Sequence, residues 1–281
     1  MKKVYDCFCY FNEDMLLELR LETLWDYVDY FVISEAVYTQ VGNKKPLNFD
    51  INKFDKYREK IRYLVVDHYP PGEMNFWKNE NYQRNYVING LFDAQDDDWI
   101  LISDLDEIPR PETISQYCPQ RYKRGDFQQH AYVYRLNNLS VKPDGSAAIW
   151  QGSKVTTYRY LRDFFKTATE VRSYKSSGAL RGLRRFLFKK LMTQKIQNGG
   201  WHFTWILSIE KLILKMESIA EQQHNKEEYK NPVYIQSQID SGLDVIDPRS
   251  RYIAQLIATD QFPEFLVNNI EKYRDWLRKT K

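Results

Sequence analysis

The chain of 281 residues is long enough for one large α/β domain, and 43% hydrophobic with 28% charged residues is typical of a globular protein. A net charge of +3 is too small to indicate nucleic acid as a partner, and no apolar run reaches about 18 residues, the length of a membrane span. The amino terminus lacks the apolar core of a signal peptide, and Cys7, Cys9 and Cys118 are odd in number without histidines matched for zinc. These features predict a cytoplasmic chain that binds no nucleic acid, although a catalytic fragment of a membrane-anchored protein would look the same.

The first part of the chain alternates apolar strands with amphipathic helices, which is typical of a nucleotide-binding α/β half-domain. Two strands joined by one helix favour a right-handed parallel unit, so these strands should form one sheet. Neither a Gly-x-Gly-x-x-Gly fingerprint nor a Walker-type Gly-Lys-Ser occurs, which leaves a dinucleotide site or P-loop unsupported. The predicted strands are 4–11, 30–34, 61–66 and 99–102, and the predicted helices follow Asn12 or span 51–60 and 75–92.

The strand at 99–102 is followed by three carboxylates, Asp104, Asp106 and Glu107, and then by Pro109. Open α/β sheets bind ligands at the carboxyl ends of their strands. Residues two apart in an extended backbone project to the same side, so Asp104 and Asp106 can converge on one cation. Carboxylate oxygens suit Mg²⁺ or Mn²⁺, which in turn suit a diphosphate. The alternative for an isolated Asp-x-Asp is a solvated turn.

Two more charged residues are predicted near this edge of the sheet. Glu35 directly follows the second strand and is either a ligand contact or a loop carboxylate in water. Arg84 lies one helical turn after Glu80 on the helix that precedes the Asp-x-Asp strand. Its guanidinium is either a phosphate clamp or half of a surface ion pair.

The middle of the chain is less regular. Residues 126–139 and 147–160 alternate as strands do, with a turn at 142–145 between them. Trp150 and Gly152 could place an indole beside a close backbone approach, although core packing is the more common role of a tryptophan.

Residues 180–195 combine leucines at helical spacing with six Lys or Arg side chains. A basic amphipathic helix can lie on an anionic membrane surface, so peripheral membrane contact is one interpretation. Arg184 falls on the apolar side, which favours the other interpretation, an ordinary solvated helix.

A single histidine then follows two glycines. Gly199 and Gly200 precede His202, which has aromatic residues around it, so a tight backbone path is expected to position one imidazole. The alternative is a structural histidine of the core or surface. A helix from Ile209 and a last helix begun by Pro263 complete the predicted elements.

Six separated segments carry a resemblance to a known family: 11–13, 17–22, 29–35, 80–85, 103–109 and 200–205. In this order they resemble glycosyltransferase family 17, which includes the β-1,4-mannosyl-glycoprotein 4-β-N-acetylglucosaminyltransferases. Ser-Asp-Leu-Asp-Glu-Ile-Pro and Gly-Trp-His with a trailing Trp are specific in combination. Residues 160–198 and those beyond 206 show little of the family pattern, so the acceptor stays open.

The resemblance implies a GT-A-like α/β fold: a single Rossmann-type sheet, mostly parallel, with helices on both faces and a helical C-terminal part. It also implies a UDP-N-acetylglucosamine donor, a divalent cation, Mn²⁺ or Mg²⁺, and inversion at the anomeric carbon. Asp104 and Asp106 resemble the Asp-x-Asp that holds metal and diphosphate, and His202 resembles a late histidine that completes metal coordination. Glu35 and Arg84 fall where the nucleotide would be gripped.

The expected organisation is a nucleotide-sugar-binding half (1–110), an acceptor-side half of the same domain (111–205) and a helical C-terminal region (206–281). The expected function is a metal-dependent inverting glycosyltransferase that transfers N-acetylglucosamine to a glycan. Inversion needs a base at the acceptor hydroxyl, for which Asp163, Glu170 and Glu107 are alternatives. The rival functions are a metal-dependent phosphoesterase, for which the four histidines are few, and a non-catalytic carbohydrate-binding protein, against which the βα order argues.

Overall fold

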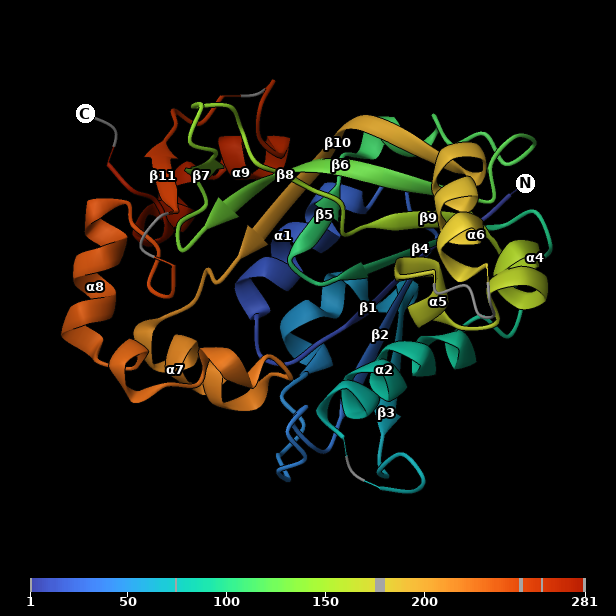
Figure 1. Cartoon of the computed structure of the whole chain (residues 1–281), viewed down its shortest axis with the longest axis horizontal. Helices are drawn as coiled ribbons and strands as arrows, with labels where there is room; N and C mark the ends of the chain where they lie inside the picture. The colour runs from blue at the N-terminus through green and yellow to red at the C-terminus, as the bar shows by residue number, and fades with distance from the viewer. Residues whose placement is uncertain (1, 74, 175–179, 248–249, 259, 280–281) are drawn as a thin grey trace.

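The computed structural model describes residues 2–73, 75–174, 180–247, 250–258 and 260–279. In these ranges eleven strands form one mixed sheet that runs through the whole molecule, with helices on both of its faces (Figure 1). The strands are β1 (Val4–Cys9), β2 (Tyr30–Ala36), β3 (Ile61–Val66), β4 (Trp99–Asp104), β5 (Glu107–Pro109), β6 (Arg124–Val133), β7 (Asn138–Val141), β8 (Ile149–Trp150), β9 (Lys154–Thr157), β10 (Thr193–Thr204) and β11 (Arg251–Ala254).

The four strands predicted in the first part of the chain are all present and all parallel, in the order β3-β2-β1-β4. Cys9 pairs with Ser34 on one side and with Asp104 on the other, so the carboxyl ends of three strands lie level. These strands are apolar on both faces because helices cover both. The prediction of an α/β fold built on a single, largely parallel sheet is confirmed.

The rest of the sheet is mixed. β9 runs antiparallel to β4 and to β6, whereas β6 and β10 are parallel. The single strand predicted over 126–139 is wrong, because the chain turns at Tyr134 with a φ of 61° and resumes as β7. The strand predicted over 147–160 is also interrupted. It becomes β8 and β9, and the Thr157 hydroxyl then accepts a hydrogen bond from the amide of Tyr160 and starts a helical turn.

The helices of the described ranges are α1 (Asp14–Leu24), α2 (Phe76–Tyr86), α3 (Pro111–Ile114), α4 (Tyr158–Tyr160), α5 (Ala168–Arg172), α6 (Arg181–Leu187), α7 (Ile209–Ser218), α8 (Pro232–Ser241) and α9 (Glu264–Asn268). Short 3-10 helices occupy Ile51–Lys60, Val87–Gly90, Gln222–His224, Glu227–Tyr229 and Ile270–Trp276, and π-helical turns occupy Leu161–Phe165 and Phe188–Met192. None of these helices is long and apolar enough to cross a membrane.

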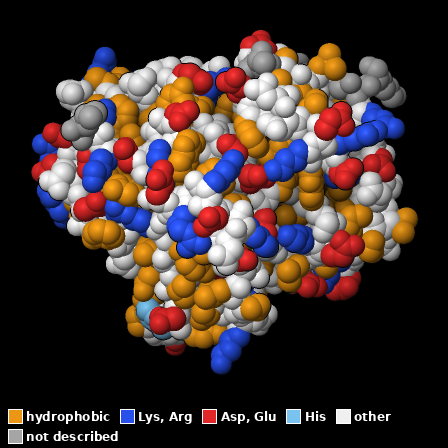
Figure 2. Space-filling view, turned by 180° about the vertical axis from the view of Figure 1, so that it is seen from behind, with side chains coloured by type: hydrophobic (Ala, Val, Ile, Leu, Met, Phe, Trp, Pro, Cys, Tyr) orange, Lys and Arg blue, Asp and Glu red, His pale blue; other side chains and the backbone are white. Residues whose placement is uncertain are grey.

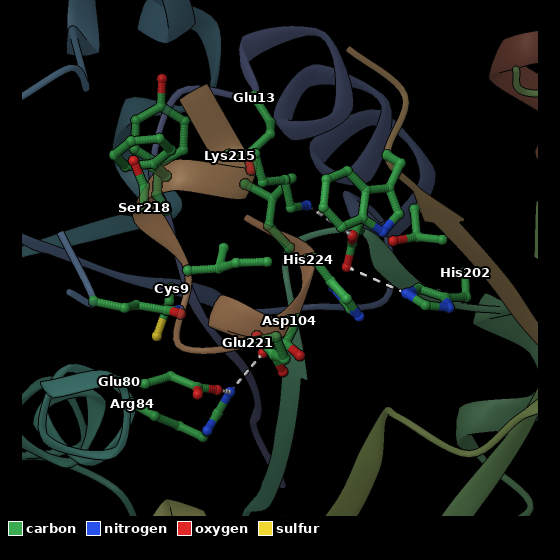
Figure 3. A pocket seen from close by; sticks show the side chains of 18 of the residues that line it. Cys9, Glu13, Glu80, Arg84, Asp104, His202, Lys215, Ser218, Glu221 and His224 are labelled. Atoms are coloured by element: carbon green, nitrogen blue, oxygen red, sulfur yellow. Dashed lines mark hydrogen bonds and ion pairs between the residues drawn. The ribbon is translucent and has the colours of Figure 1, made fainter. Parts of the chain in front are cut away.

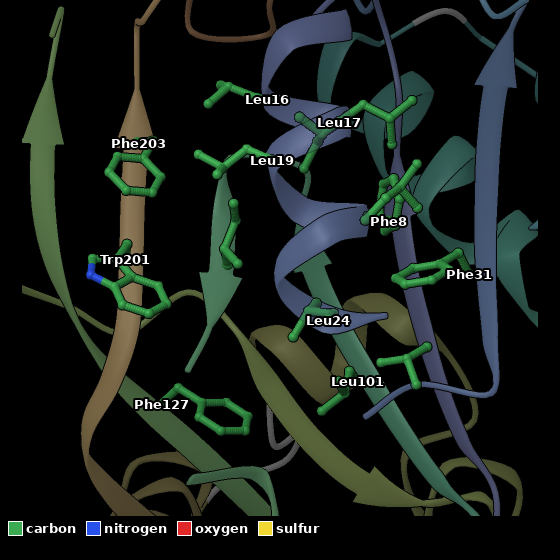
Figure 4. Packing of buried hydrophobic residues seen from close by; sticks show 14 of the residues in the cluster. Phe8, Leu16, Leu17, Leu19, Leu24, Phe31, Leu101, Phe127, Trp201 and Phe203 are labelled. Carbon is green, nitrogen blue, oxygen red and sulfur yellow. The ribbon is translucent and has the colours of Figure 1, made fainter. Parts of the chain in front are cut away.

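Apolar side chains on the two faces of the sheet form separate clusters. On one face, α1 packs its leucines on Phe8, Phe31 and Leu101 of the parallel strands, and the same cluster continues to Trp201 and Phe203 of β10 (Figure 4). On the other face, strand residues pack against α5 and the helical turns beside it; these strand residues are Tyr5, Cys7, Val32, Ile100 and Ile102. The prediction of helices on both faces is confirmed.

The C-terminal region is not purely helical. α7 and α8 pack over the end of β6 in a third apolar cluster that includes Tyr134, Leu212 and Ile235. β11 pairs antiparallel with β7 and so joins this region to the main sheet. The division of the chain at residue 206 stays a prediction.

The face of the molecule seen from behind carries both signs of charge. Lys and Arg side chains are interspersed with Asp and Glu across its width (Figure 2). Such mixing matches the small net charge of +3. On this face no charge of one sign dominates.

One buried arginine ties α1 to β1 and to the turn after β4. Arg20 is fully buried and donates to both carboxylate oxygens of Asp6, at 2.6 and 2.7 Å. Its Nη1 also donates to backbone carbonyls of the turn after β4, those of Asp104, Leu105 and Glu107, at 3.1, 3.1 and 2.8 Å. The Arg20 guanidinium thus holds the backbone of residues 104–107, the acidic turn, in place.

We expect Asp6→Ala to lower the free energy of unfolding by about 3–5 kcal/mol, because it leaves the Arg20 guanidinium buried without its counterion. The double variant D6L/R20M should lose less free energy of unfolding than the sum of the losses in D6L and in R20M. Urea unfolding of the single and double variants measures both. Asp55→Ala is the control, because its pair with Arg58 is exposed and should contribute about 0–1 kcal/mol. Equal losses for Asp6→Ala and Asp55→Ala would contradict the role of the buried pair.

Candidate functional site

A cavity of about 570 Å³ lies at the carboxyl ends of β1 and β4, beside α2 and α7 (Figure 3). On the side of β1 and β2 it is lined by the rings of Tyr10, Phe11 and Tyr38. On the side of β8 and β10 it is lined by Trp150 and Trp205. The cavity has the size and mixed lining of a small-molecule site. It brings together four of the predicted site residues: Arg84, Asp104, Asp106 and His202.

Asp104 is held between two arginines. Arg84 of α2 donates to its Oδ1 at 3.0 Å, and Arg172 of α5 donates to its Oδ2 at 2.7 Å. Burial would raise the pKa of Asp104, but the charges of Arg172 and Arg84 outweigh it and hold the pKa well below its usual range. Arg84 also pairs with Glu80 at 2.5 Å. The pair with Glu80 is largely buried and so is not the surface ion pair of one interpretation, while the phosphate clamp stays a prediction.

Glu107 is fully buried, and hydrogen-bond donors surround its carboxylate. It accepts from Arg172 at 2.5 and 3.0 Å, from the Trp150 indole at 2.7 Å and from the backbone amide of Asp104 at 3.0 Å. Burial would raise the pKa of Glu107, yet the Arg172 charge holds it below the usual value. A Cβ on Gly152 would lie 1.9 Å from Glu107 Oε1, so only glycine fits beside this carboxylate. The close backbone approach predicted at Gly152 is confirmed.

Asp106 has a different environment. Its Oδ1 lies 3.7 Å from His202 Nε2, and its Oδ2 lies 3.7 Å from Lys215 Nζ. Both distances are longer than a hydrogen bond. Burial raises the pKa of Asp106, and Lys215 and His202 offset this only in part. Asp106 is therefore the carboxylate of the acidic turn whose charge is least compensated.

β10 and β8 together place His202. β10 pairs with β5, so that His202 lies opposite Glu107. Gly200 has a φ of +128°, and a Cβ there would lie 2.2 Å from the carbonyl oxygen of Ile108, which confirms the tight backbone path predicted before the histidine. The His202 ring stacks on Trp150 with centroids 4.7 Å apart. Trp150 is 44% exposed, so its role at the cavity differs from the more common core packing.

Three other predicted residues lie outside the cavity lining. Glu35 is fully buried and accepts hydrogen bonds from Lys45, Tyr63 and the amides of Asn48 and Phe49, which fastens the loop after β2. Asp163 is on the surface, paired with Arg162. Glu170 lies on α5 with its backbone amide bonded to Thr167. Their predicted roles in donor binding and proton transfer stay predictions.

Four residues around the acidic turn were missed in the sequence: Arg20, Arg172, Lys215 and Glu221. Two carried a local signal, because Arg20 and Lys215 occupy positions within the apolar spacing of α1 and α7, where a cation must have a buried partner. Arg172 carried none, since its partners are 65 and 68 residues away along the chain. Glu221 follows α7 and lines the cavity with His224 (Figure 3).

The side chains around Asp106 suit a divalent cation. A carboxylate and an imidazole face the same cavity 3.7 Å apart, and both are ligands that Mn²⁺ accepts. Asp104 fits less directly, because both of its oxygens already bind guanidinium groups. Among the residues that the structure describes, no group of three or more His, Cys, Asp or Glu is positioned to hold a metal.

Curated relatives match most of this chain at low identity. The β-1,4-mannosyl-glycoprotein 4-β-N-acetylglucosaminyltransferase of Rattus norvegicus is 24% identical, over 94% of this chain and 52% of that protein. The Homo sapiens protein of the same name is 26% identical, over 74% of this chain and 41% of that protein. The chain thus spans about half the length of the curated relatives it matches.

Two solved structures are similar over most of the chain. A 4-diphosphocytidyl-2C-methyl-D-erythritol synthase has a TM-score of 0.39 and 12% identity, over 70% of this chain and 89% of that chain. Glucosyl-3-phosphoglycerate synthase from Mycobacterium tuberculosis, in complex with Mn²⁺, UDP-glucose and glycerol 3-phosphate, has a TM-score of 0.37 and 13% identity, over 70% and 71% of the two chains.

The family assignment rests on the sequence match. Residues 1–192 match glycosyltransferase family 17, and this range contains β1 to β9 and the acidic turn. It ends before β10, so His202 and Lys215 lie beyond the matched residues. The resemblance drawn from the separated segments is confirmed, and the chain belongs to glycosyltransferase family 17.

Proposed function

We propose that this protein is a metal-dependent inverting glycosyltransferase that transfers N-acetylglucosamine from UDP-N-acetylglucosamine to a glycan acceptor. The observation that carries the proposal is the acidic turn itself. One of its carboxylates, Asp106, faces the cavity with an imidazole and an ammonium group, while its neighbours Asp104 and Glu107 are neutralised by arginines. Membership of family 17 and the names of the curated relatives support the sugar and the reaction class.

The donor is proposed to bind with its uracil toward β1 and β2 and its diphosphate toward the acidic turn. Aromatic faces such as Tyr10 and Tyr38 can stack on a base. Lys215 and Arg84 point cationic groups into the cavity, which suits the phosphate oxygens. Trp205, beneath the Lys215 ammonium at 5.3 Å, keeps that cation in place.

Asp106 and His202 would hold Mn²⁺ or Mg²⁺, with the diphosphate as a further source of ligands. Asp104 would bind the same ion only after one of its oxygens lost its contact with Arg84 or Arg172. Bound there, the ion would neutralise charge on the departing UDP. The Lys215 ammonium lies 3.7 Å from Asp106, beside the proposed metal position. It would therefore also neutralise negative charge on the departing UDP.

The base must lie in the cavity, where the acceptor hydroxyl attacks the anomeric carbon and loses its proton as UDP leaves. Of the predicted alternatives, Glu107 is saturated with hydrogen bonds, and Asp163 and Glu170 do not line the cavity. We assign the role to Glu221, which lines the cavity on the turn after α7. Burial raises its pKa, and the nearby Glu80 charge adds to this effect. A carboxylate with a raised pKa is the better proton acceptor.

Asp106→Asn should abolish the stabilisation that Mn²⁺ adds to UDP binding, because an amide is a far weaker metal ligand than a carboxylate. In the unchanged protein, a ligand at 100 times its dissociation constant adds about 2.7 kcal/mol of stability. Thermal unfolding with UDP, with and without Mn²⁺, measures the effect. Asp163→Asn is the control and should behave as the unchanged protein. An undiminished Mn²⁺ effect in Asp106→Asn would exclude Asp106 as the ligand.

Lys215→Met should weaken UDP binding about 10- to 100-fold, because a hydrogen bond to a charged group contributes about 1.5–3 kcal/mol. Isothermal titration with UDP in the absence of metal isolates this contribution. Lys211→Met is matched to it, since Lys211 lies one turn earlier on α7 and its ammonium donates to the backbone of Asn12. Equal affinities for the two variants would remove Lys215 from the donor site.

Glu221→Gln should lower turnover about 10²- to 10⁴-fold and leave UDP affinity unchanged, because the amide cannot take a proton. In the unchanged protein, the rate should rise with pH through a pKa above the ordinary value of a glutamate, since the base must be deprotonated. UDP release from UDP-N-acetylglucosamine with a panel of mannoside acceptors measures turnover, and Glu217→Gln is the control on α7.

Other outcomes of this assay would redirect the assignment. A comparable loss in D163N or E170Q, with E221Q active, would return the role of base to the residues predicted from the sequence. Release of phosphate from a phosphoester, without UDP release, would support the phosphoesterase. Sugar binding without affinity for any uridine nucleotide would support a carbohydrate-binding protein.

A further inference from the structure

Phe188 is the buried side chain of the helical segment from Arg181 to Met192. α6 continues directly into the π-helical turn Phe188–Met192, and every residue of the segment except Phe188 is exposed. The Phe188 ring packs against Tyr174 and Phe164, with centroids 4.2 and 5.8 Å away. Figure 1 shows α6 at the opposite end of the molecule from α7 and α8.

The exposed side of this segment is apolar. Five large side chains that recur three or four residues apart are 41–58% exposed: Leu180, Leu183, Phe186, Leu187 and Leu191. At about 100° per residue Leu180, Leu183, Phe186 and Leu187 fall on one side of α6, and the buried Phe188 begins the π-helical turn that follows. A surface helix of a globular protein has the reverse arrangement, with its apolar stripe against the core. The ordinary solvated helix favoured from the sequence does not explain this exposure.

The charges of the segment are all of one sign. Arg181, Arg184, Arg185, Lys189 and Lys190 alternate with the apolar residues, and no Asp or Glu occurs between Val171 and Ile209 in the sequence. This differs from the mixed charges of the face in Figure 2. Clustered leucines and phenylalanine with flanking cations match an interface that has an apolar interior and an anionic surface.

We propose that residues 180–192 form a membrane-docking surface that binds a bilayer containing anionic phospholipid. The segment lies in the plane of the headgroups, with Leu183, Phe186 and Leu187 among the upper acyl carbons and the lysines at the phosphates. A second copy of this chain is a poor occupant, because the two apolar stripes would bring ten basic side chains together. The proposal does not depend on the reaction assigned above.

Docking through this segment leaves the cavity open. β10 begins at Thr193, which pairs with Arg124 at the start of β6, so the segment lies at the amino edge of these strands. The cavity lies at the opposite edge, where β4 ends in Asp104. The surface therefore tethers the enzyme without covering its donor site.

Cosedimentation with vesicles tests the proposal. The chain should bind vesicles of phosphatidylcholine mixed with phosphatidylglycerol much more tightly than vesicles of phosphatidylcholine alone, and high salt should weaken the binding. K189E/K190E should weaken it about 30-fold or more, at about 1 kcal/mol for each basic side chain removed from the surface. L183S/F186S should weaken it as well, because the apolar anchor is lost while the charge stays.

The matched control is R274E/K279E, which makes the same change in charge near the C-terminus, at the other end of the molecule (Figure 1). It should bind like the unchanged protein, and K189E/K190E should keep its affinity for UDP. Equal binding to both vesicle types, or equal loss in the control, would overturn the proposal. So would dimerisation in sedimentation velocity that L183S/F186S abolishes while vesicles are not bound.

Discussion

The burial of negative charge at the end of β4 is the constraint on which the rest of the structure depends. The turn from Asp104 to Glu107 carries three carboxylates, of which Glu107 is fully buried and Asp106 nearly so, and a buried charge is costly unless it is paired. Three arginines, each from a different helix, hold this turn. Arg84 of α2 and Arg172 of α5 pair with its carboxylates, whereas Arg20 of α1 pairs with Asp6 and donates to the backbone carbonyls of the turn. The helices on both faces of the sheet are thereby fastened to one turn.

This arrangement divides the three carboxylates by role. Asp104 and Glu107 are held ionised by guanidinium groups, which fixes their geometry and removes them as proton acceptors. Asp106 keeps a raised pKa and longer contacts to His202 and Lys215. A carboxylate that is incompletely paired gains more from an added cation than one that guanidinium groups already neutralise. Preorganisation of the neighbours thus leaves one carboxylate available for binding.

The cavity and the α6 segment occupy opposite edges of the sheet, and they differ in what holds them. The cavity is built on strand ends and buried ion pairs, which suits a site whose geometry must be precise. The α6 segment buries the Phe188 ring against Tyr174 and leaves its apolar stripe exposed. Such an exposure has a free-energy cost that a partner surface would recover. An enzyme with this layout could be attached at one edge and exchange substrates at the other.

The sequence by itself determined the parallel half of the sheet, the position of Asp104 and Asp106 at its carboxyl edge, and the tight glycine path before His202. These features follow from apolar runs, strand–helix alternation and the special conformation of glycine, all of which act over a few residues. Only the tertiary structure decided that Arg172 neutralises Asp104 and Glu107, that Glu35 fastens a loop, and that the stripe of α6 faces outward. Those outcomes depend on contacts between residues far apart in the chain, and on which side of a helix meets the core, which local patterns leave undetermined.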